Sequence, residues 1–497
     1  MTATGTLLDE LPRVCASLPD FLAGQRWFGG KGRPIASTAI ADHASLDDVE
    51  AALLAMIDVV YVDGDHERYF VPLLAAAGDR AAGGAAIART GESVVVDALT
   101  DPGFCRSMLA TLARGPELTT ELGGQILFRP RSRLAGFAAH HRSVSVRFST
   151  AEQSNSSVFF DQKFILKAFR RLQEGPNPEL EVLAFLTNHT DFAHVPELAG
   201  VIEYRAPDGG RLALGVLQDF VANEGDGWSH TLRELERLSS GEEATAGLAS
   251  GYLASTTDLG HVTADLHLAF ASAPHVADFA PTPITREDVL EWERAIAGRV
   301  KRMFIRLDQH FAAHPEAMRG LDMIPTLPHL RDTVDGLMWL ADGTLTKTRH
   351  HGDYHLGQVL KTADSWVVID FEGEPLRPIA ERRARHTPLK DVAGMLRSLS
   401  YAAAVAARER PLSTGSSPRA AFGSRLRTWE RRARRAFLDA YLGKARSAGA
   451  TFLPRSRAGV RSVLAALELE KAVYELEYEL DNRPDWVAIP LRALAGS

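Results

Sequence analysis

One stretch of the sequence decides the fold: it reads HHGDYHLGQVL from His350 to Leu360 and continues, after a short polar gap, as WVVIDFE from Trp366 to Glu372. The order of polar and apolar residues predicts a loop, a short strand, a turn and a buried strand that ends on an acid. The Asp353 carboxylate can accept a proton from a hydroxyl group. Gln358 and Asp370 carry oxygens of the kind that Mg²⁺ prefers. A base and two metal-directed side chains so close together are what phosphoryl transfer needs, because that chemistry consists mostly of positioning groups and neutralising charge.

The spacing within the stretch agrees with this interpretation. Asp353 and Gln358 are five residues apart, as are the Asp and Asn of the kinase catalytic loop H-R-D-x-x-x-x-N. Asp370 follows an apolar strand and precedes Phe371, as in D-F-G. Two residues depart from the pattern. Gln358 replaces Asn and adds a methylene group, which leaves its distance to a metal open, and Glu372 replaces Gly, which disfavours a flip of this segment as an activation switch.

Three histidines in the same stretch, His350, His351 and His355, raise the alternative of a metal-histidine site. His351 and His355 are four residues apart, as they would be on one face of a helix. Gly352 disfavours a helix there, however, and no carboxylate stands at the spacing found in zinc proteases. The stretch therefore favours phosphoryl transfer over metal-histidine chemistry.

Length and composition limit the class of protein. The chain has 497 residues, which predicts two to four packed units. Hydrophobic residues make up 45% and charged residues 24%, which is typical of a globular protein. The net charge of −7 argues against a general nucleic-acid binder, so an anionic nucleotide would have to be held by local cations and a metal. The two cysteines exclude a disulfide framework.

The chain shows no targeting or membrane signal. Its first 19 residues contain neither a basic segment nor a long apolar run, and no apolar window approaches the ~20 residues of a membrane span. We therefore expect a cytoplasmic protein without a membrane partner, in a compartment that also supplies ATP.

The patterns divide the chain into three parts. Residues 1–90 form a cap with a helix near the start and two strands, 59–62 and 69–73, around a turn. Residues 91–220 are strand-rich, with a hairpin at 158–169 and a further strand at 212–220. Residues 221–497 are mostly helical, with predicted helices at 253–270, from Thr387, and at 458–481.

Lys167 is the clearest candidate in the strand-rich part. It lies in the apolar segment ILKAF, and a buried ammonium group needs a partner. The side chain either faces solvent or contacts a nucleotide phosphate, oriented by a carboxylate. Glu181, at the predicted start of a helix, is the expected partner, and Glu179 competes for that role.

Two further segments of this part are candidates for nucleotide contacts. The polar connection 149–157 has no glycine, but Ser154 and Ser156 offer hydroxyl groups to a phosphate; an ordinary hairpin connection is the alternative. The strand that ends at Gln218 and Phe220 runs into a polar segment that could serve as a hinge, where an adenine would bind backbone groups.

The last predicted helix has two unlike faces. Tyr474, Glu475 and Tyr478 share one face with Lys471. Aromatic rings and a carboxylate suit a sugar, because rings cover C–H surfaces and carboxylates bind hydroxyl groups. A partly exposed helix face is the alternative.

Together these motifs resemble a known family. HGD at 351–353 and DF at 370–371 are similar to the aminoglycoside-phosphotransferase-like branch of the protein-kinase-like fold. A more detailed resemblance to bacterial maltokinases covers nearly the whole chain. It runs through QRWFGGKGR (25–33), EQSNSS (152–157), FRRL (169–172), GPNPELE (175–181), EPLRP (374–378) and NRPDW (482–486). Actinobacterial glucosamine kinases share much of this frame.

The resemblance implies a fold and a set of roles. The fold is α+β, a bilobal protein-kinase-like fold with an N-terminal α/β cap subdomain and a mostly helical C-terminal lobe. Asp353 would be the catalytic base, Gln358 and Asp370 the Mg²⁺ ligands, and Lys167 the ATP phosphate contact, oriented by Glu181.

It also implies a reaction. The expected activity is ATP-dependent phosphorylation of maltose to maltose 1-phosphate, in metabolism linked to trehalose and glycogen. Alternatives are a glucosamine kinase that forms glucosamine 6-phosphate and a catalytically silent nucleotide-binding regulator. A trehalose synthase is a conceivable partner, and the chain could be a monomer or a dimer. The expected sugar contacts are His351, Glu372, Arg377, Tyr474, Glu475 and Tyr478.

Overall fold

The computed structural model describes residues 7–46, 49, 51–77, 86–90, 93–134, 143–149, 154–240, 246–314, 327–375, 377–409 and 416–495. The chain forms two compact units, and each is described by itself. The N-terminal unit comprises Met1–Ala184 and Pro196–Ala222, and the C-terminal unit comprises Phe185–Val195 and Asn223–Ser497. The chain passes from the first unit to the second within helix α4 (Pro178–His189), returns after Val195 and passes to the second unit again after Ala222.

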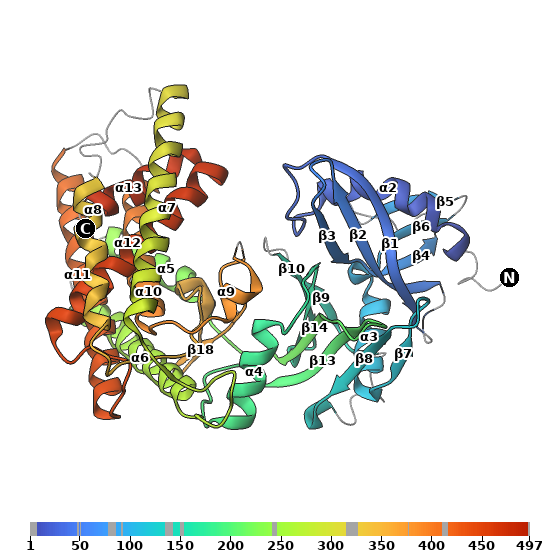
Figure 1. Cartoon of the computed structure of the whole chain (residues 1–497), viewed down its shortest axis with the longest axis horizontal. Helices are drawn as coiled ribbons and strands as arrows, with labels where there is room; N and C mark the ends of the chain where they lie inside the picture. Colours follow the sequence, from blue (N-terminus) through green and yellow to red (C-terminus); the bar gives the residue numbers. More distant parts are fainter. Residues whose placement is uncertain are drawn as a thin grey trace. The chain divides into compact units, whose positions relative to one another are not determined.

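The first sheet of the N-terminal unit is antiparallel and contains the cap strands (Figure 1). Its strands are β1 (Ile35–Ser45), β2 (Ala52–Tyr61), β3 (His66–Phe70), β4 (Leu73–Ala77), β5 (Ala86–Thr90), β6 (Ser93–Asp97) and β12 (Arg171–Leu172). The order along the sheet is β12-β3-β2-β4-β6-β5, and β1 pairs with β2 outside this path. The predicted pair of strands around the turn at 63–65 is confirmed as the β2–β3 hairpin, but the bounds differ, because β2 already begins at Ala52 and β3 ends at Phe70.

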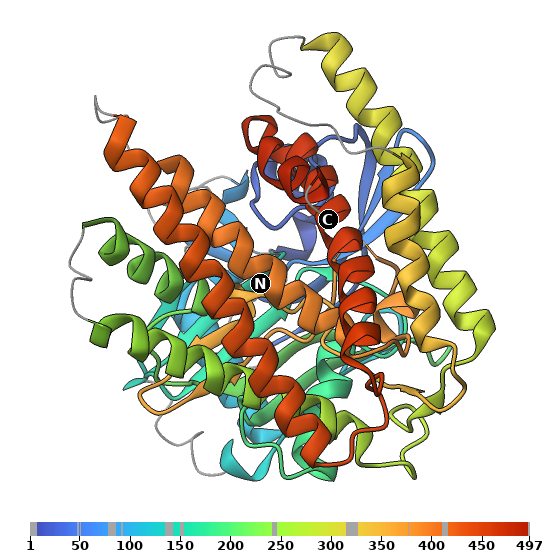
Figure 2. The same cartoon turned by 90° about the vertical axis from the view of Figure 1, so that its left-hand side faces the viewer.

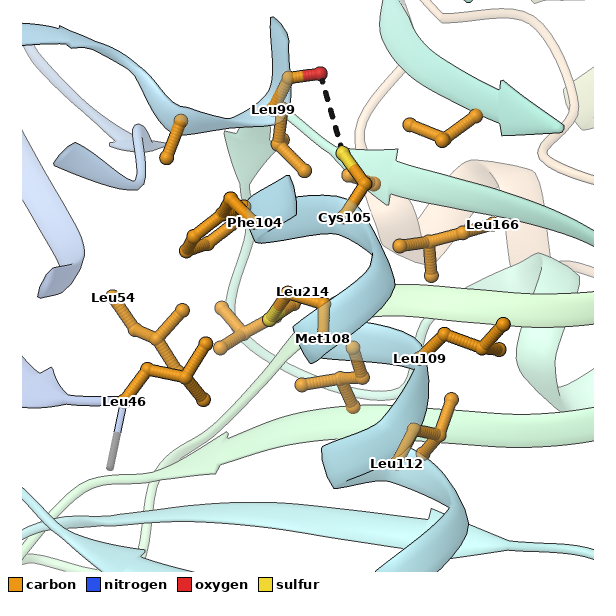
Figure 3. Packing of buried hydrophobic residues seen from close by; sticks show 14 of the residues in the cluster. Leu46, Leu54, Leu99, Phe104, Cys105, Met108, Leu109, Leu112, Leu166 and Leu214 are labelled. Atoms are coloured by element: carbon orange, nitrogen blue, oxygen red, sulfur yellow. Dashed lines mark hydrogen bonds between the residues drawn. The ribbon is translucent and has the colours of Figure 1, made fainter. Parts of the chain in front are cut away.

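Strand β2 is buried on both faces, and this explains why the cap sheet carries a helix on each side. Leu54 and Met56 point into one core and Leu53 and Ile57 into another, as the two-residue period of a strand requires. Helix α2 (Leu11–Gly24) covers the second face. Helix α3 (Pro102–Arg114) covers the first, where it packs among residues of both sheets of this unit (Figure 3).

The second sheet of this unit is also antiparallel, in the order β7-β8-β13-β14-β11-β10-β9. Its strands are β7 (Glu117–Thr119), β8 (Gln125–Pro130), β9 (Val146–Phe148), β10 (Asn155–Phe160), β11 (Phe164–Phe169), β13 (Leu198–Arg205) and β14 (Arg211–Asp219). The predicted hairpin at 158–169 is confirmed: Asp161 and Gln162 form its turn with φ of 48° and 52°, as a tight hairpin turn requires.

A buried arginine joins the two sheets. Arg170, between β11 and β12, donates to both carboxylate oxygens of Asp97 at the end of β6, to the Phe70 carbonyl and to the Ser156 hydroxyl. Its guanidinium carbon lies 4.6 Å from the centre of the Trp27 ring. The two sheets of this unit are therefore held together by an ion pair from which water is excluded.

The C-terminal unit is mostly helical, as predicted. Its helices are α5 (Gly227–Ser240), α6 (Ala246–Ala271), α7 (Arg286–Ala313), α8 (Leu327–Val334), α9 (Ile379–Arg383), α10 (Leu389–Glu409), α11 (Ser416–Ser447), α12 (Arg457–Asn482) and α13 (Ala488–Ala495). Helix α10 packs against both α11 and α12, and α11 packs against α6 (Figure 2). No helix in the described parts of the chain is long and apolar enough to cross a membrane.

Short elements complete the two units. Strands β15 (Thr282–Pro283) and β16 (Thr346–Lys347) form one ribbon, and β17 (Val359–Lys361) and β18 (Trp366–Val368) form another. The 3₁₀ turns are η2 (Ala98–Thr100), η3 (Ser132–Leu134), η7 (Asp335–Leu340), η8 (Leu356–Gln358) and η9 (Pro484–Trp486). The deciding stretch is thus a loop, the turn η8 and the β17–β18 ribbon, close to the prediction.

Candidate active site

A buried carboxylate on α10, that of Asp391, holds the loop that carries Asp353. One oxygen of Asp391 accepts a hydrogen bond from the backbone N–H of His351 at 2.7 Å and the other accepts from Gly352 at 2.9 Å. His267 of α6 donates to the same carboxylate at 3.1 Å. Burial alone would raise the pKa of the Asp391 carboxyl, but its partners hold this pKa well below its usual value. An ionised Asp391 therefore positions the loop.

Gly352 gives this loop its sharp turn. Its φ is 86°, in the left-handed region that glycine adopts without strain. The turn sends the next side chain, Asp353, towards helix α12.

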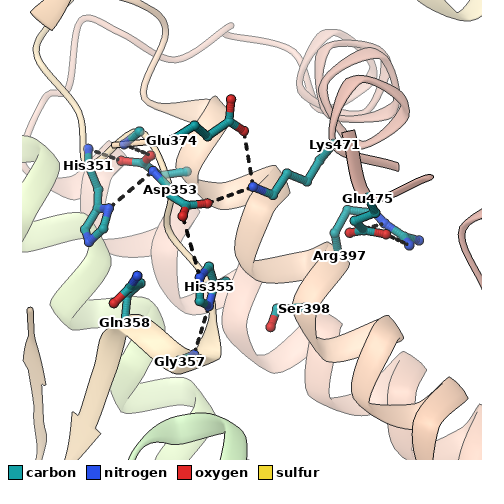
Figure 4. Close-up of polar contacts among 12 residues, drawn as sticks. His351, Asp353, His355, Gly357, Gln358, Glu374, Arg397, Ser398, Lys471 and Glu475 are labelled. Atoms are coloured by element: carbon teal, nitrogen blue, oxygen red, sulfur yellow. Dashed lines mark hydrogen bonds and ion pairs between the residues drawn. The ribbon is translucent and has the colours of Figure 1, made fainter. Parts of the chain in front are cut away.

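Asp353 is held by a lysine from that helix. The Nζ of Lys471 donates to Asp353 Oδ1 at 2.8 Å and to Glu374 Oε1 at 3.2 Å (Figure 4). The Nε2 of His355 lies 3.8 Å from the other Asp353 oxygen. The sequence placed Lys471 on a sugar-binding face; the structure makes it the partner of the predicted base.

These contacts keep the base ionised. Burial would raise the pKa of the Asp353 carboxyl, but the charges of Lys471 and His355 outweigh burial and hold the pKa below its ordinary value. Burial would lower the pKa of Lys471, but Asp353 and Glu374 raise it, so the ammonium stays charged. The same cluster lowers the pKa of Glu374 to about 2 against the effect of burial.

The two predicted metal ligands lie together in the C-terminal unit. The amide nitrogen of Gln358 donates to Asp370 Oδ2 at 2.9 Å, which leaves the amide oxygen for another partner. Asp370 has a φ of 65°, uncommon for a residue other than glycine and frequent at functional sites. An amide oxygen beside a carboxylate is a donor set that fits Mg²⁺.

His351 has a structural role, contrary to the predicted sugar contact. Its Nε2–H donates to the Ile369 carbonyl at 2.9 Å, and its Nδ1 accepts from the backbone of Asp353 at 3.3 Å. The ring is buried against Tyr354 and Phe371. His351 therefore ties the base loop to the strand that leads to Asp370, and it has no atom left for a substrate.

Lys167 of the N-terminal unit has a buried carboxylate partner, but that partner is Glu179, so the prediction of Glu181 is wrong. Lys167 Nζ lies 2.7 Å from Glu179 Oε2, and the Gln218 amide donates to the other Glu179 oxygen at 3.1 Å. The side chain of Glu179 is only 2% exposed. Because residues two apart on a helix point about 200° apart, Glu181 instead lines a cavity beside β13 and β14.

The serine prediction is partly wrong. Ser156 lies in β10, not in the connection, and its hydroxyl accepts the Arg170 hydrogen bond. Ser154 is exposed and accepts from the side chain of Asn155 at 3.3 Å. Residues 150–153 lie outside the described residues.

The strand that leads into the predicted hinge is β14, which ends at Asp219, close to the predicted end. The backbone of Gln218 is registered between β11 and β13, and the N–H of Phe220 donates to the Lys163 carbonyl at 2.7 Å. The backbone of Gln218 and the N–H of Phe220 are therefore already paired, which argues against these groups as adenine contacts. The Gln218 side chain instead belongs to the Lys167–Glu179 cluster.

Three of the remaining predicted sugar contacts lie on α12, and their surroundings differ. Both oxygens of Glu475 accept from Arg397, which contradicts a role in binding hydroxyl groups. Tyr478 is exposed, with the guanidinium of Arg483 5.6 Å from its ring centre. Tyr474 is half-buried, with the Lys471 ammonium 4.5 Å from its ring centre.

Two more of these predictions concern the turn after Asp370. Arg377 is bound to Glu374 and Glu470 and lines a cavity of the C-terminal unit. The backbone carbonyl of Glu372 accepts from Arg382 at 3.1 Å.

Comparisons with known proteins agree with this geometry. Residues 21–101 match the maltokinase N-terminal cap domain. A glucosamine kinase of Mycolicibacterium smegmatis is 27% identical over 395 residues, which cover 79% of this chain and 87% of the relative. A glucosamine kinase of Streptacidiphilus jiangxiensis is 29% identical over 342 residues, which cover 68% and 70%.

The chain is a relative of the maltokinases and glucosamine kinases. It is an enzyme of the phosphotransferase class. A solved glucosamine kinase structure superposes with a TM-score of 0.66 at 23% identity and covers 98% of both chains. Another, in complex with glucosamine, ADP and inorganic phosphate, gives a TM-score of 0.64 at 22% identity and covers 96% of this chain and 98% of that one. The predicted α+β, bilobal kinase-like fold with an N-terminal cap is confirmed.

Proposed function

We propose that this protein is an ATP-dependent sugar kinase in which Asp353 is the general base. The observation that carries the proposal is the Asp353 carboxylate, held ionised by Lys471 on a loop that Asp391 fixes. A base in that state can accept the proton of a sugar hydroxyl while the hydroxyl oxygen attacks the terminal phosphorus of ATP. The new O–P bond forms, the bond to ADP breaks and the proton passes to Asp353.

The other groups would serve the nucleotide. Lys167, held by Glu179, supplies a positive charge for phosphate oxygens. Mg²⁺ bound by the oxygens of Gln358 and Asp370 would neutralise charge on the phosphates. Gln358 and Lys167 each bind a partner of their own, so their side chains are pre-oriented.

Maltose is the proposed acceptor, with maltose 1-phosphate as product, because the cap domain matches that of maltokinases. Glucosamine is the second candidate, because the two relatives that match over most of the chain are glucosamine kinases. The test incubates the protein with ATP, Mg²⁺ and a panel of sugars, follows ADP release, and locates the phosphate by ³¹P NMR. Turnover of glucosamine alone would assign the second function, and nucleotide binding without turnover of any sugar would indicate a regulator.

Lys471→Met is expected to move the pH dependence of turnover. Burial then raises the pKa of Asp353 without the opposing charge of Lys471. Since the base works ionised, kcat/KM is retained above that pKa and lost below it. Its acid limb should therefore move to higher pH, by about one to three pH units. Measurement of kcat/KM from pH 4 to 9 tests this.

The control for that experiment is Lys444→Met, which removes a lysine from a partly exposed pair with Asp265. Its acid limb should not move, and Lys471→Arg should restore most of the wild-type profile. An unchanged acid limb in Lys471→Met would show that the lysine does not tune the base.

Glu179→Gln is expected to weaken nucleotide binding about tenfold or more, because Lys167 loses the carboxylate that orients it. Calorimetric titration with a non-hydrolysable ATP analogue and Mg²⁺ measures the effect. Glu181→Gln on the same helix is the matched control and should bind within about twofold of wild type. Equal weakening in both variants would contradict the assignment of Glu179.

A further inference from the structure

Helix α6 holds the base loop on both sides of Asp353, through two side chains of one helix face. Thr263 and His267 are four residues apart, so they point the same way from the helix. Thr263 contacts Tyr354, the residue that follows the base. His267 contacts Asp391, whose carboxylate binds the backbone of the two residues before the base. The position of the base therefore depends on a helix that does not carry it.

The contact after the base is a buried hydrogen bond with one possible direction. The Thr263 hydroxyl donates to the Leu259 carbonyl at 2.7 Å, so its oxygen accepts from the Tyr354 hydroxyl at 2.9 Å. The backbone is equally confined, because a Cβ on Gly394 of α10 would lie 2.5 Å from the Tyr354 carbonyl oxygen. Tyr354 is therefore fixed at its side chain and at its backbone.

The contact before the base continues to a third helix. An ionised Asp391 can only accept hydrogen bonds, so His267 donates to it from Nε2 at 3.1 Å. In a neutral imidazole the Nδ1 is then an acceptor, and the Tyr441 hydroxyl of α11 donates to it at 2.9 Å. A chain of hydrogen bonds thus runs from Tyr441 through His267 and Asp391 to the backbone of the base loop.

This chain lies in the interior of the C-terminal unit. His267, Asp391 and Tyr441 are all buried. Helices α6 and α11 approach closely beside it, since a Cβ on Gly260 would collide with the carbonyl of Phe437, one turn before Tyr441. A buried polar group that loses its partner is destabilised more than an exposed one. Loss of the Tyr441 hydroxyl should therefore loosen the imidazole ring and, with it, the carboxylate that holds the loop.

We propose that His267 and Tyr441 are positioning residues for the base. They act through Asp391: by fixing its orientation they fix the two N–H groups that it binds, and so the direction in which Asp353 points. The inference rests on the proposed kinase function and deepens it, because it assigns the placement of the base to helices α6 and α11. A catalytic group displaced by about 1 Å can lose about a hundredfold in rate, so a partial loss of this support lowers kcat and leaves substrate binding intact.

Tyr441→Phe tests this proposal, because it removes one hydroxyl and keeps the ring. The kcat of sugar phosphorylation should fall about tenfold, while KM for ATP and for the sugar stay within about twofold. Tyr252→Phe is the matched control, since Tyr252 is buried in α6 and its hydroxyl binds Thr231 of α5 at 2.8 Å. The control should lose a similar amount of thermal stability and keep its kcat. Equal losses of kcat in the two variants would overturn the positioning role.

A double-mutant cycle tests the order of the chain. His267→Leu should lower kcat further than Tyr441→Phe does, and His267→Gln, which keeps a donor and an acceptor, should recover part of that loss. Because Tyr441 acts through His267, the addition of Tyr441→Phe to His267→Leu should change kcat by less than about twofold. Effects that multiply independently would contradict the chain.

Hydrogen–deuterium exchange separates this inference from the proposed function, because it needs no sugar. Followed by mass spectrometry, it reports the protection of the N–H groups of His351 and Gly352, which Asp391 binds. A peptide that contains both should exchange about tenfold faster in Tyr441→Phe than in the wild type or in Tyr252→Phe. If no sugar is phosphorylated, the kinase function fails and faster exchange still supports the hydrogen-bond chain. Unchanged exchange in Tyr441→Phe would overturn the inference.

Discussion

Asp353→Asn is expected to lower the rate of sugar phosphorylation by about 10²–10⁴-fold, the usual contribution of a general base. The amide keeps the size of the side chain but cannot accept the proton of the attacking hydroxyl. Lys471 keeps a partner in Glu374, so the cluster should remain folded. The measurement is ADP release under saturating sugar and ATP.

Two controls make that result specific. Asp364→Asn changes an exposed acid in the turn between β17 and β18 of the same unit and should leave the rate unchanged. The dissociation constant of an ATP analogue should stay within about threefold in Asp353→Asn, because the nucleotide contacts are elsewhere. Substantial retained turnover would mean that another group is the base.

The largest expected effect on stability is at Arg170. Its side chain and that of Asp97 are only 2% and 3% exposed. Arg170→Met leaves the Asp97 carboxylate buried without its cation and removes the donors to Ser156 and the Phe70 carbonyl. Loss of one partner of a buried ion pair costs about 3–5 kcal/mol. We expect the free energy of unfolding of the N-terminal unit to fall by that amount in urea titrations.

The neighbouring arginine provides the control. Arg171 pairs with Glu67, but its side chain is 44% exposed. An ion pair of this kind contributes about 0–1 kcal/mol, so Arg171→Met should unfold near the wild-type urea concentration. If both variants lose stability equally, the link between the cap and the second sheet is not the buried Arg170–Asp97 pair.

Local patterns in the sequence were enough for several elements of the fold. The alternation at 158–169 with Asp-Gln between its halves predicts the β10–β11 hairpin, because only a tight turn reverses the chain in two residues. The Thr387-Pro388 pair predicts the start of α10, because a capping threonine followed by proline is typical of the beginning of a helix.

Helix phase explains the largest error at the site. Glu179 and Glu181 are both acids near the start of one helix, and the sequence alone gives no preference between them. The position of β11 relative to α4 decides the matter, because only one of the two carboxylates can point at Lys167. The prediction for Ser156 failed for a related reason, since strand β10 includes this residue, which the polar pattern assigned to a connection.

The sequence by itself was enough to predict the chemistry. The order and spacing of Asp353, Gln358 and Asp370 predict a base beside two oxygen ligands, since a loop and a short ribbon keep residues so close in sequence close in space. Only the tertiary structure decided what surrounds that chemistry. Lys471 reaches Asp353 across 118 residues, and Asp391 reaches the loop across 39 and 40. Such contacts depend on how α10 and α12 pack, and packing is set by the whole hydrophobic core, which no local pattern encodes.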